Sequence, residues 1–188
     1  APAGAISALE HLDSYQIVIG QLEIPQEVTI AAFKKAKDFG AITILNPAPF
    51  ALISPDLISV SDWIIPNESE FVGMHPQGLG PTSDENILEI AATLKTRFVV
   101  TLGEKGAAFT TRDGEIRRVA APQVKAIDTT GAGDAFVGAF AVGLAAHLSD
   151  EKAIALGCAC ASESVTRKGT QSSYPTPAQA QEILGSID

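Results

Sequence analysis

Short apolar segments alternate with helical patterns along the first hundred residues of the chain. Strand-like apolar segments occupy residues 16–19, 42–45, 63–65 and 98–100, and apolar side chains recur at three- and four-residue steps in residues 26–39 and 83–95. Alternation of this kind predicts a parallel sheet covered by helices on both faces. We therefore expect an α/β fold.

The pattern changes after residue 106. Residues 107–111 and 116–120 predict a β-hairpin, joined by a turn that contains Asp113-Gly114. Helical patterns follow up to about residue 147, at 151–166 and at 176–184. Because 188 residues is the length of one ordinary domain and no internal repeat is present, we expect residues 1–188 to form a single domain.

The composition argues against several classes of protein. With 46% hydrophobic residues, 19% charged residues and a formal net charge of −9, the chain is typical of a globular protein that does not bind nucleic acid or an anionic membrane. No apolar run reaches membrane-spanning length. Its two cysteines, Cys158 and Cys160, give no disulfide framework, so we expect a cytoplasmic protein, with an organelle reached through an upstream targeting peptide as the alternative.

Polar or glycine-containing segments follow each expected parallel strand. They occupy residues 20–23, 46–47, 66–70 and 101–106. Parallel sheets bind their ligands beyond the carboxyl ends of the strands, and these four segments would gather at that edge. Any one of them is an ordinary turn, but together they favour a binding site.

The run Asp128-Thr129-Thr130-Gly131-Ala132-Gly133-Asp134 lies just before an apolar helical pattern. Glycines let the backbone approach a ligand closely, and the unpaired N–H groups of a helix start attract anions such as phosphate. Asp134 would lie in the first turn beside the phosphate, where a carboxylate can accept a proton from an attacking alcohol. The alternative is an aspartate favoured by the helix dipole alone. A dinucleotide-binding fingerprint fails at Phe136, where its third glycine would fall, and no P-loop sequence is present.

Two further segments have both a structural and a functional interpretation. Asn67-Glu68-Ser69-Glu70 either caps a helix or supplies a magnesium ligand, since Mg²⁺ keeps most of its waters and needs few protein carboxylates. Arg167-Lys168-Gly169 closes a helix with basic residues and a glycine, as helix C-termini commonly do. Taken alone, the residues favour capping for both segments.

On these motifs the chain resembles the ribokinase-like (PfkB-type) carbohydrate kinases. The resemblance rests mainly on residues 128–136 and 66–70, and residues 45–49, 101–106 and 165–169 add to it. It covers essentially the whole chain, in order. It implies a three-layer α-β-α fold with a mostly parallel sheet. It also implies ATP-dependent phosphorylation of the primary hydroxyl of a small sugar, with D-ribose as the first candidate.

The resemblance implies roles for individual residues as well. Asp134 would be the base that takes the proton from the sugar hydroxyl, and Glu23 would contact the sugar. The amides of Gly131, Ala132 and Gly133 would form the anion hole for the migrating phosphoryl group. The nucleotide would be bound by Asn67, Thr101, Leu102, Gly103, Glu104, Lys105, Gly106, Gly133 and Cys158.

Two metal ions are implied as cofactors besides ATP. Glu70 would help to hold Mg²⁺. A K⁺ ion beside the anion hole would be bound, in part through backbone carbonyls, by Asp128, Thr130, Ser164, Arg167, Gly169 and Ser173. Such an ion would order the loop that presents the anion-hole amides. It would also give the turn at 167–169 a function besides capping.

Members of the family carry a further N-terminal segment with sugar-binding motifs and a small β lid, and this chain matches none of them. We therefore expect it to begin partway through the family's α/β domain, without several strands, the lid and most sugar contacts. The alternatives to a ribose kinase are a kinase for another sugar or a nucleoside, and a truncated chain that binds nucleotide without turnover. The expected partners are a sugar and ATP, with a homodimer or pairing with the missing N-terminal segment left open.

Overall fold

The computed structural model describes residues 16–74 and 82–187. Contacts within the chain define two compact units. The described residues of 1–100 and 109–117 form the first, here called the strand unit, and those of 101–108 and 118–188 form the second, called the helical unit. The single domain predicted from chain length stays a prediction.

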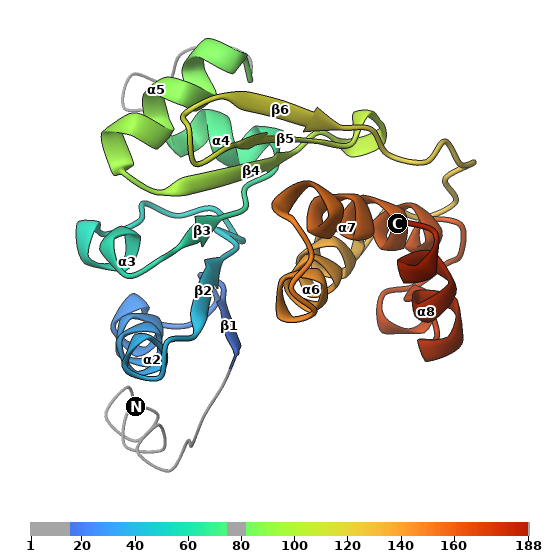
Figure 1. The fold of residues 1–188 in the computed structure, drawn as a ribbon, viewed down its shortest axis with the longest axis horizontal. Coiled ribbons are helices and arrows are strands. Elements are labelled where there is room, and N and C mark those ends of the chain that lie inside the picture. Colours follow the sequence, from blue (N-terminus) through green and yellow to red (C-terminus); the bar gives the residue numbers. More distant parts are fainter. Residues whose placement is uncertain (1–15, 75–81, 188) are drawn as a thin grey trace. The chain divides into compact units, whose positions relative to one another are not determined.

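The strands lie in one sheet in chain order (Figure 1). They are β1 (Ile17–Gly20), β2 (Ile42–Leu45), β3 (Trp63–Ile64), β4 (Arg97–Thr101), β5 (Ala107–Thr110) and β6 (Ile116–Val119). The pairs β1–β2, β2–β3 and β3–β4 are all parallel. A turn closed by the Thr111 N–H donating to the Glu115 carbonyl at 2.8 Å joins β5 to β6. The predicted mostly parallel sheet is confirmed.

The helices of the strand unit are α2 (Gln26–Asp38), α3 (Pro55–Ser59), α4 (Glu68–Met74) and α5 (Asp84–Leu94). α2 buries one face, including Val28, Phe33 and Ala36, and contacts β1 and β2 (Figure 1). α5 begins after Ser83, whose hydroxyl accepts a hydrogen bond from the Asn86 N–H and so satisfies one free donor of the first turn. None of the helices in residues 16–74 and 82–187 is both long and apolar enough to cross a membrane.

Burial in the core of the strand unit explains why its strands are continuous apolar runs in the sequence. In β4, the consecutive residues Phe98, Val99 and Val100 are all fully buried, so alternation with polar residues is lost. The ring of Phe71 from α4 meets Phe98 edge-on, with centroids 6.4 Å apart.

The helical unit contains α6 (Ala132–Ala145), α7 (Asp150–Ser164), α8 (Pro177–Gly185) and two short 3₁₀ turns, η2 (Gly103–Lys105) and η3 (Gln171–Ser173). α6 and α7 lie side by side (Figure 1). Glycines allow this contact, because a Cβ at Gly143 would lie 2.8 Å from the Cα of Ala153, and one at Gly157 would lie 2.9 Å from the ring of Phe136. The helices predicted in this region are present, with ends shifted slightly from the predicted positions.

Candidate functional site

The candidate site is built around the start of α6. Gly131 is the N-cap and adopts a left-handed conformation, with φ of 81°. A Cβ at this position would also lie 3.1 Å from the Oη atom of Tyr174, so the position favours glycine for two reasons. Asp134 is exposed in the first turn of the helix. The aspartate is therefore accessible from solvent and is not buried among apolar side chains.

The backbone amides before α6 are only partly engaged. The N–H of Ala132 donates to the Thr129 carbonyl at 3.2 Å. In the part of the chain that the structure describes, the N–H groups of Gly131 and Gly133 donate to no backbone carbonyl. No side chain there caps this helix. Two of the three predicted anion-hole amides are thus open to an anion.

A cavity of about 360 Å³ adjoins this helix start, within the helical unit. Its size falls in the range of small-molecule sites, roughly 300–1,000 Å³. The lining residues that the sequence predicted as nucleotide contacts are Thr101, Gly103, Glu104, Gly106, Gly133 and Cys158. Leu102 is buried and Lys105 is exposed, and neither lines the cavity. The structure therefore brings together most of the predicted nucleotide loop and the predicted anion hole.

A further part of the cavity wall was not predicted. It is formed by Ala121, Pro122, Gln123, Val124 and Ala126, between the hairpin and α6. The Gln123 amide donates to the Glu104 carbonyl at 3.1 Å, which joins this wall to the predicted nucleotide loop. The segment carries no motif. Its only signal in the sequence is an irregular stretch between two regular elements.

Cys158 provides an inert surface to the cavity. It is 3% exposed, and burial raises the pKa of its thiol to about 12. The pKa of Cys160 is also raised, first by burial and then by the charge of Glu163. Both thiols are neutral at ordinary pH, so neither is a nucleophile or a thiolate ligand.

Asp128 joins the two loops that flank the helix pair. One carboxylate oxygen accepts from the Thr130 N–H and the other from the Gly169 N–H, each at 3.0 Å. These bonds, with Gly169 first, lower the pKa of Asp128 to about 2. The carboxylate is therefore charged at neutral pH and holds together two segments 41 residues apart.

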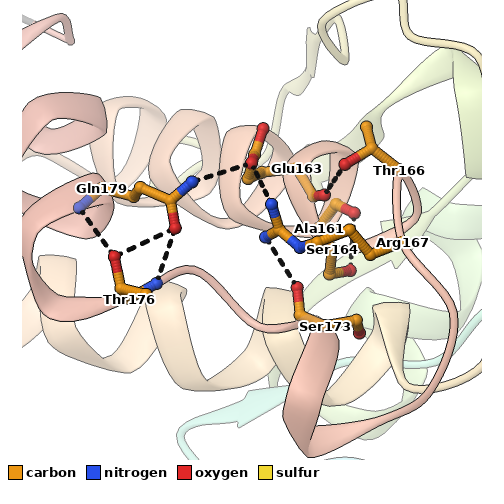
Figure 2. A network of polar contacts seen from close by, with 8 residues as sticks. All are labelled: Ala161, Glu163, Ser164, Thr166, Arg167, Ser173, Thr176 and Gln179. Carbon is orange, nitrogen blue, oxygen red and sulfur yellow. Dashed lines mark hydrogen bonds and ion pairs between the residues drawn. The ribbon is translucent and has the colours of Figure 1, made fainter.

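Arg167 organises the end of α7 (Figure 2). Its guanidinium donates to Glu163 at 2.7 Å and to the Ser173 carbonyl at 2.9 Å. The Gln179 amide also donates to Glu163, at 3.2 Å, while Gln179 and Thr176 form the capping box of α8. α7, η3 and α8 are thus linked by one polar network. The turn at 167–169 does more than end a helix.

The predicted potassium ligands form two groups in the helical unit. Asp128, Thr130 and Gly169 are bonded together, as described, and the second group is Ser164, Arg167 and Ser173. In that group the Ser164 carbonyl accepts from the Arg167 N–H at 3.4 Å. One carboxylate with several carbonyls is a donor set that suits a hard cation of low charge. The described residues contain no group of three or more His, Cys, Asp or Glu side chains able to hold a metal ion.

Asn67, Glu70 and Glu23 belong to the strand unit. Asn67 and Glu70 form a reciprocal capping pair: each backbone N–H donates to the other's side chain at 2.8 Å. Burial raises the pKa of Glu70, although the Asn67 N–H opposes this. The geometry is therefore that of helix capping. Glu23 is exposed in the loop between β1 and α2.

Tyr174 was missed by sequence reasoning. It lies against Gly131, and its pKa is raised first by burial and then by the negative charge of Asp134. The predicted cation set ended one residue earlier, at Ser173. No motif distinguishes Tyr174 in the sequence.

Comparison with known proteins assigns the family. The family model described as "pfkB family carbohydrate kinase" matches residues 5–177, and the chain belongs to this family. It is 34% identical over 177 residues to a ribokinase of Schizosaccharomyces pombe, covering 91% of this chain and 56% of that protein. It is 38% identical over 190 residues to a deoxyribokinase of Salmonella typhi, covering 98% of this chain and 61% of that one.

A solved structure shows the same fold. Ribokinase of Arabidopsis thaliana, in complex with ribose and ATP, superimposes with a TM-score of 0.84 at 28% identity, over 96% of this chain and 58% of that one. The predicted three-layer α/β class is confirmed by this likeness. The chain spans about three fifths of the length of these relatives.

Proposed function

We propose that this chain carries the nucleotide-binding and phosphoryl-transfer part of an ATP-dependent sugar kinase. Its family and the ribose- and ATP-bound relative support the reaction class. The observation that carries the proposal is the start of α6. Ala132 and Gly133 line the cavity there, and the exposed Asp134 follows in the same turn.

Asp134 accepts the proton of the sugar's primary hydroxyl as that oxygen bonds to the γ-phosphorus of ATP, and ADP leaves with the electron pair of the broken P–O bond. Phosphoryl transfer has a loose transition state, so the proton departs late and a weak but well-placed carboxylate is sufficient. The N–H groups of Gly131 and Gly133 stabilise the negative charge on the oxygens of the transferring phosphoryl group.

The nucleotide occupies the cavity between the loop 101–106 and the segment 121–126. Gly103 and Gly106 let the backbone lie close to it, and the neutral thiol of Cys158 supplies an apolar contact. Asn67 is assigned to the nucleotide phosphates.

Metal ions would add positive charge that neutralises the phosphates during transfer. Glu70 is assigned to Mg²⁺ through a water, since one of its oxygens already accepts from the Asn67 N–H. Asp128 and the carbonyls of Thr130, Ser164, Arg167, Gly169 and Ser173 are assigned to K⁺. The ionised state of Asp128 supports this assignment.

D-ribose is the first candidate for the acceptor, with Glu23 and Asp134 as its contacts on this chain. 2-Deoxyribose is the next, because a deoxyribokinase is among the relatives. A coupled assay of ADP release should detect turnover with a pentose and not with fructose or adenosine, and K⁺ should increase it. Turnover only with fructose or adenosine would overturn the choice of sugar and keep the reaction class.

A second candidate function is nucleotide binding without turnover. It is favoured by the share of the relatives' length that this chain matches, which is 56% for the ribokinase and 61% for the deoxyribokinase named above. ATP binding, measured by calorimetry, with no ADP release for any acceptor would support this candidate. Absence of ATP binding would overturn both.

Asp134→Asn tests the proposed base. We expect nucleotide affinity to be unchanged and turnover to fall by at least about 10²-fold, the lower end for general acid–base catalysis. Asp150→Asn is the matched control, because Asp150 also lies in the first turn of its helix, which begins after Ser149 and not after the glycine-containing segment 131–133. Near-normal turnover of Asp134→Asn, or an equal loss in the control, would remove Asp134 from this role.

A further inference from the structure

A second cavity lies in the strand unit, at the amino ends of the parallel strands. It has a volume of about 690 Å³, and Ile42, Trp63 and Arg97, the first residues of β2, β3 and β4, line it. The segments proposed to bind nucleotide and sugar follow the carboxyl ends of the strands. The second cavity is therefore at the opposite edge of these strands.

The lining of this cavity is strongly basic. Lys37, Lys95, Arg97 and Arg112 line it, and Asp62 is its one carboxylate. The four cationic residues come from the end of α2, the residue after α5, the start of β4 and the β5–β6 turn. Four positive charges against one negative charge stand out in a chain of net charge −9. Such a local excess attracts small anions.

The single carboxylate is already occupied. Asp62 accepts from the Lys37 ammonium at 2.6 Å, and from the N–H and the hydroxyl of Thr43 at 2.9 Å each. Burial opposes ionisation of Asp62, but these bonds outweigh it and the pKa is lowered. Asp62 therefore stays charged and paired with Lys37, and the remaining cations are not neutralised by it.

The remaining cations face the cavity from separate elements. Within residues 16–74 and 82–187, neither Lys95 nor Arg112 makes an ion pair. The guanidinium carbon of Arg97 lies 3.6 Å from the ring centroid of Trp63, which fixes this charge over the buried indole.

We propose that this cavity binds a small anion that carries a phosphate group, as free phosphate or as a phosphate ester. Guanidinium and ammonium groups are the usual protein partners of phosphate. The double negative charge of phosphate gains more from several converging cations than a halide does. The site does not depend on the proposed kinase function, and its failure would leave that function untouched.

Trp63 is the one tryptophan of the chain, so its emission reports on this cavity. We expect a saturable change in emission on titration with inorganic phosphate or glycerol 3-phosphate at constant ionic strength, and none with chloride. Calorimetry with the same anions gives a second readout. Tighter binding of glycerol 3-phosphate would identify an ester as the ligand class, and equal or weaker binding would identify free phosphate.

Two variants locate the binding. Lys95→Gln and Arg112→Gln should each weaken affinity about fivefold, as expected for losing a unit-charge contact about 4 Å away in water. Lys34→Gln, an exposed lysine of α2 outside the cavity, should leave affinity unchanged. Saturating the protein with a non-hydrolysable ATP analogue should not abolish the change in Trp63 emission caused by phosphate. Absence of both emission change and heat, competition by the nucleotide analogue, or equal weakening by Lys34→Gln would overturn the proposal.

Discussion

Asp128 shows how one side chain can organise two loops. Its carboxylate accepts N–H groups from Thr130, just before α6, and from Gly169, just after α7. A neutral amide offers one oxygen where the carboxylate offers two, so asparagine can accept only one of these bonds well. The spacing of the loops before α6 and after α7 therefore depends on a charged residue at 128.

The charge of Asp128 predicts a particular pH dependence of stability. Its folded pKa of about 2 lies below the unfolded value of 3.8, so its contribution is complete above about pH 4 and is lost as the pH falls toward 2. We expect Asp128→Asn to lower the free energy of unfolding by a constant amount at neutral pH, and this difference to shrink between pH 4 and pH 2. Urea denaturation of both proteins across this range measures it. A difference independent of pH would show that the carboxylate charge is not the cause.

At the level of residues, the sequence predicted the helix start at 131–134 and left two interpretations open for residues 67–70. The glycines at 131 and 133 and the aspartate at 134 lie where the motif indicated. Asn67 and Glu70 carried two interpretations, and the structure shows the capping bonds of one of them. Spacing alone does not separate a helix cap from a metal ligand, because both use the same oxygen atoms.

At the level of elements, the pair α6 and α7 forms the support of the candidate site. The two helices approach closely at Gly143 and Gly157. Within α6, the rings of Phe136 and Phe140 are stacked. Close helix packing fixes the direction in which the start of α6 faces the cavity. The position of the proposed anion hole therefore depends on small residues far along the same helix.

Gly143→Ala tests this packing. The added methyl group would overlap the backbone of Ala153, so we expect a loss of about 1–3 kcal/mol in the free energy of unfolding, as for overpacked cores. Gly138→Ala is the matched control in the same helix, where a Cβ meets nothing within 4 Å. That change should stabilise by about 0.5–1 kcal/mol, because alanine is the better helix former. A stable Gly143→Ala protein would show that the helices can separate without cost.

Helices with regular apolar spacing and strands that form short apolar runs were predicted from the sequence. The short helix α3 and the cavity wall at 121–126 were not. α2 and α5 have apolar residues at helical spacing, and the strands are short buried runs between turns. α3 is a single turn of five residues, too short for any periodicity to indicate it. The cavity wall at 121–126 has no regular structure. Its position follows from contacts with residues distant in sequence, which a local pattern does not encode.

At the level of the whole molecule, the two cavities lie in different units. The nucleotide cavity is lined entirely by the helical unit, and the basic cavity entirely by the strand unit. Ligands at the two cavities should therefore protect different parts of the chain.

Hydrogen exchange tests this division. A non-hydrolysable ATP analogue should slow amide exchange most strongly in residues 101–106 and 129–136, because ligand binding suppresses local opening at the site. Exchange in β1 and β2, which line no part of the nucleotide cavity, serves as the internal control. Slowing in β1 and β2 equal to that in residues 101–106 and 129–136 would contradict binding of the nucleotide at the cavity of the helical unit.

Gly106 restricts how the nucleotide cavity can be redesigned. It has a φ of 94°, and any Cβ there would collide with the carbonyl of Val119 and the amide of Ala121. A mutant library aimed at new nucleotide preferences should keep this position fixed. Diversity is better placed at Gln123 and Val124, whose exposed side chains border the same space.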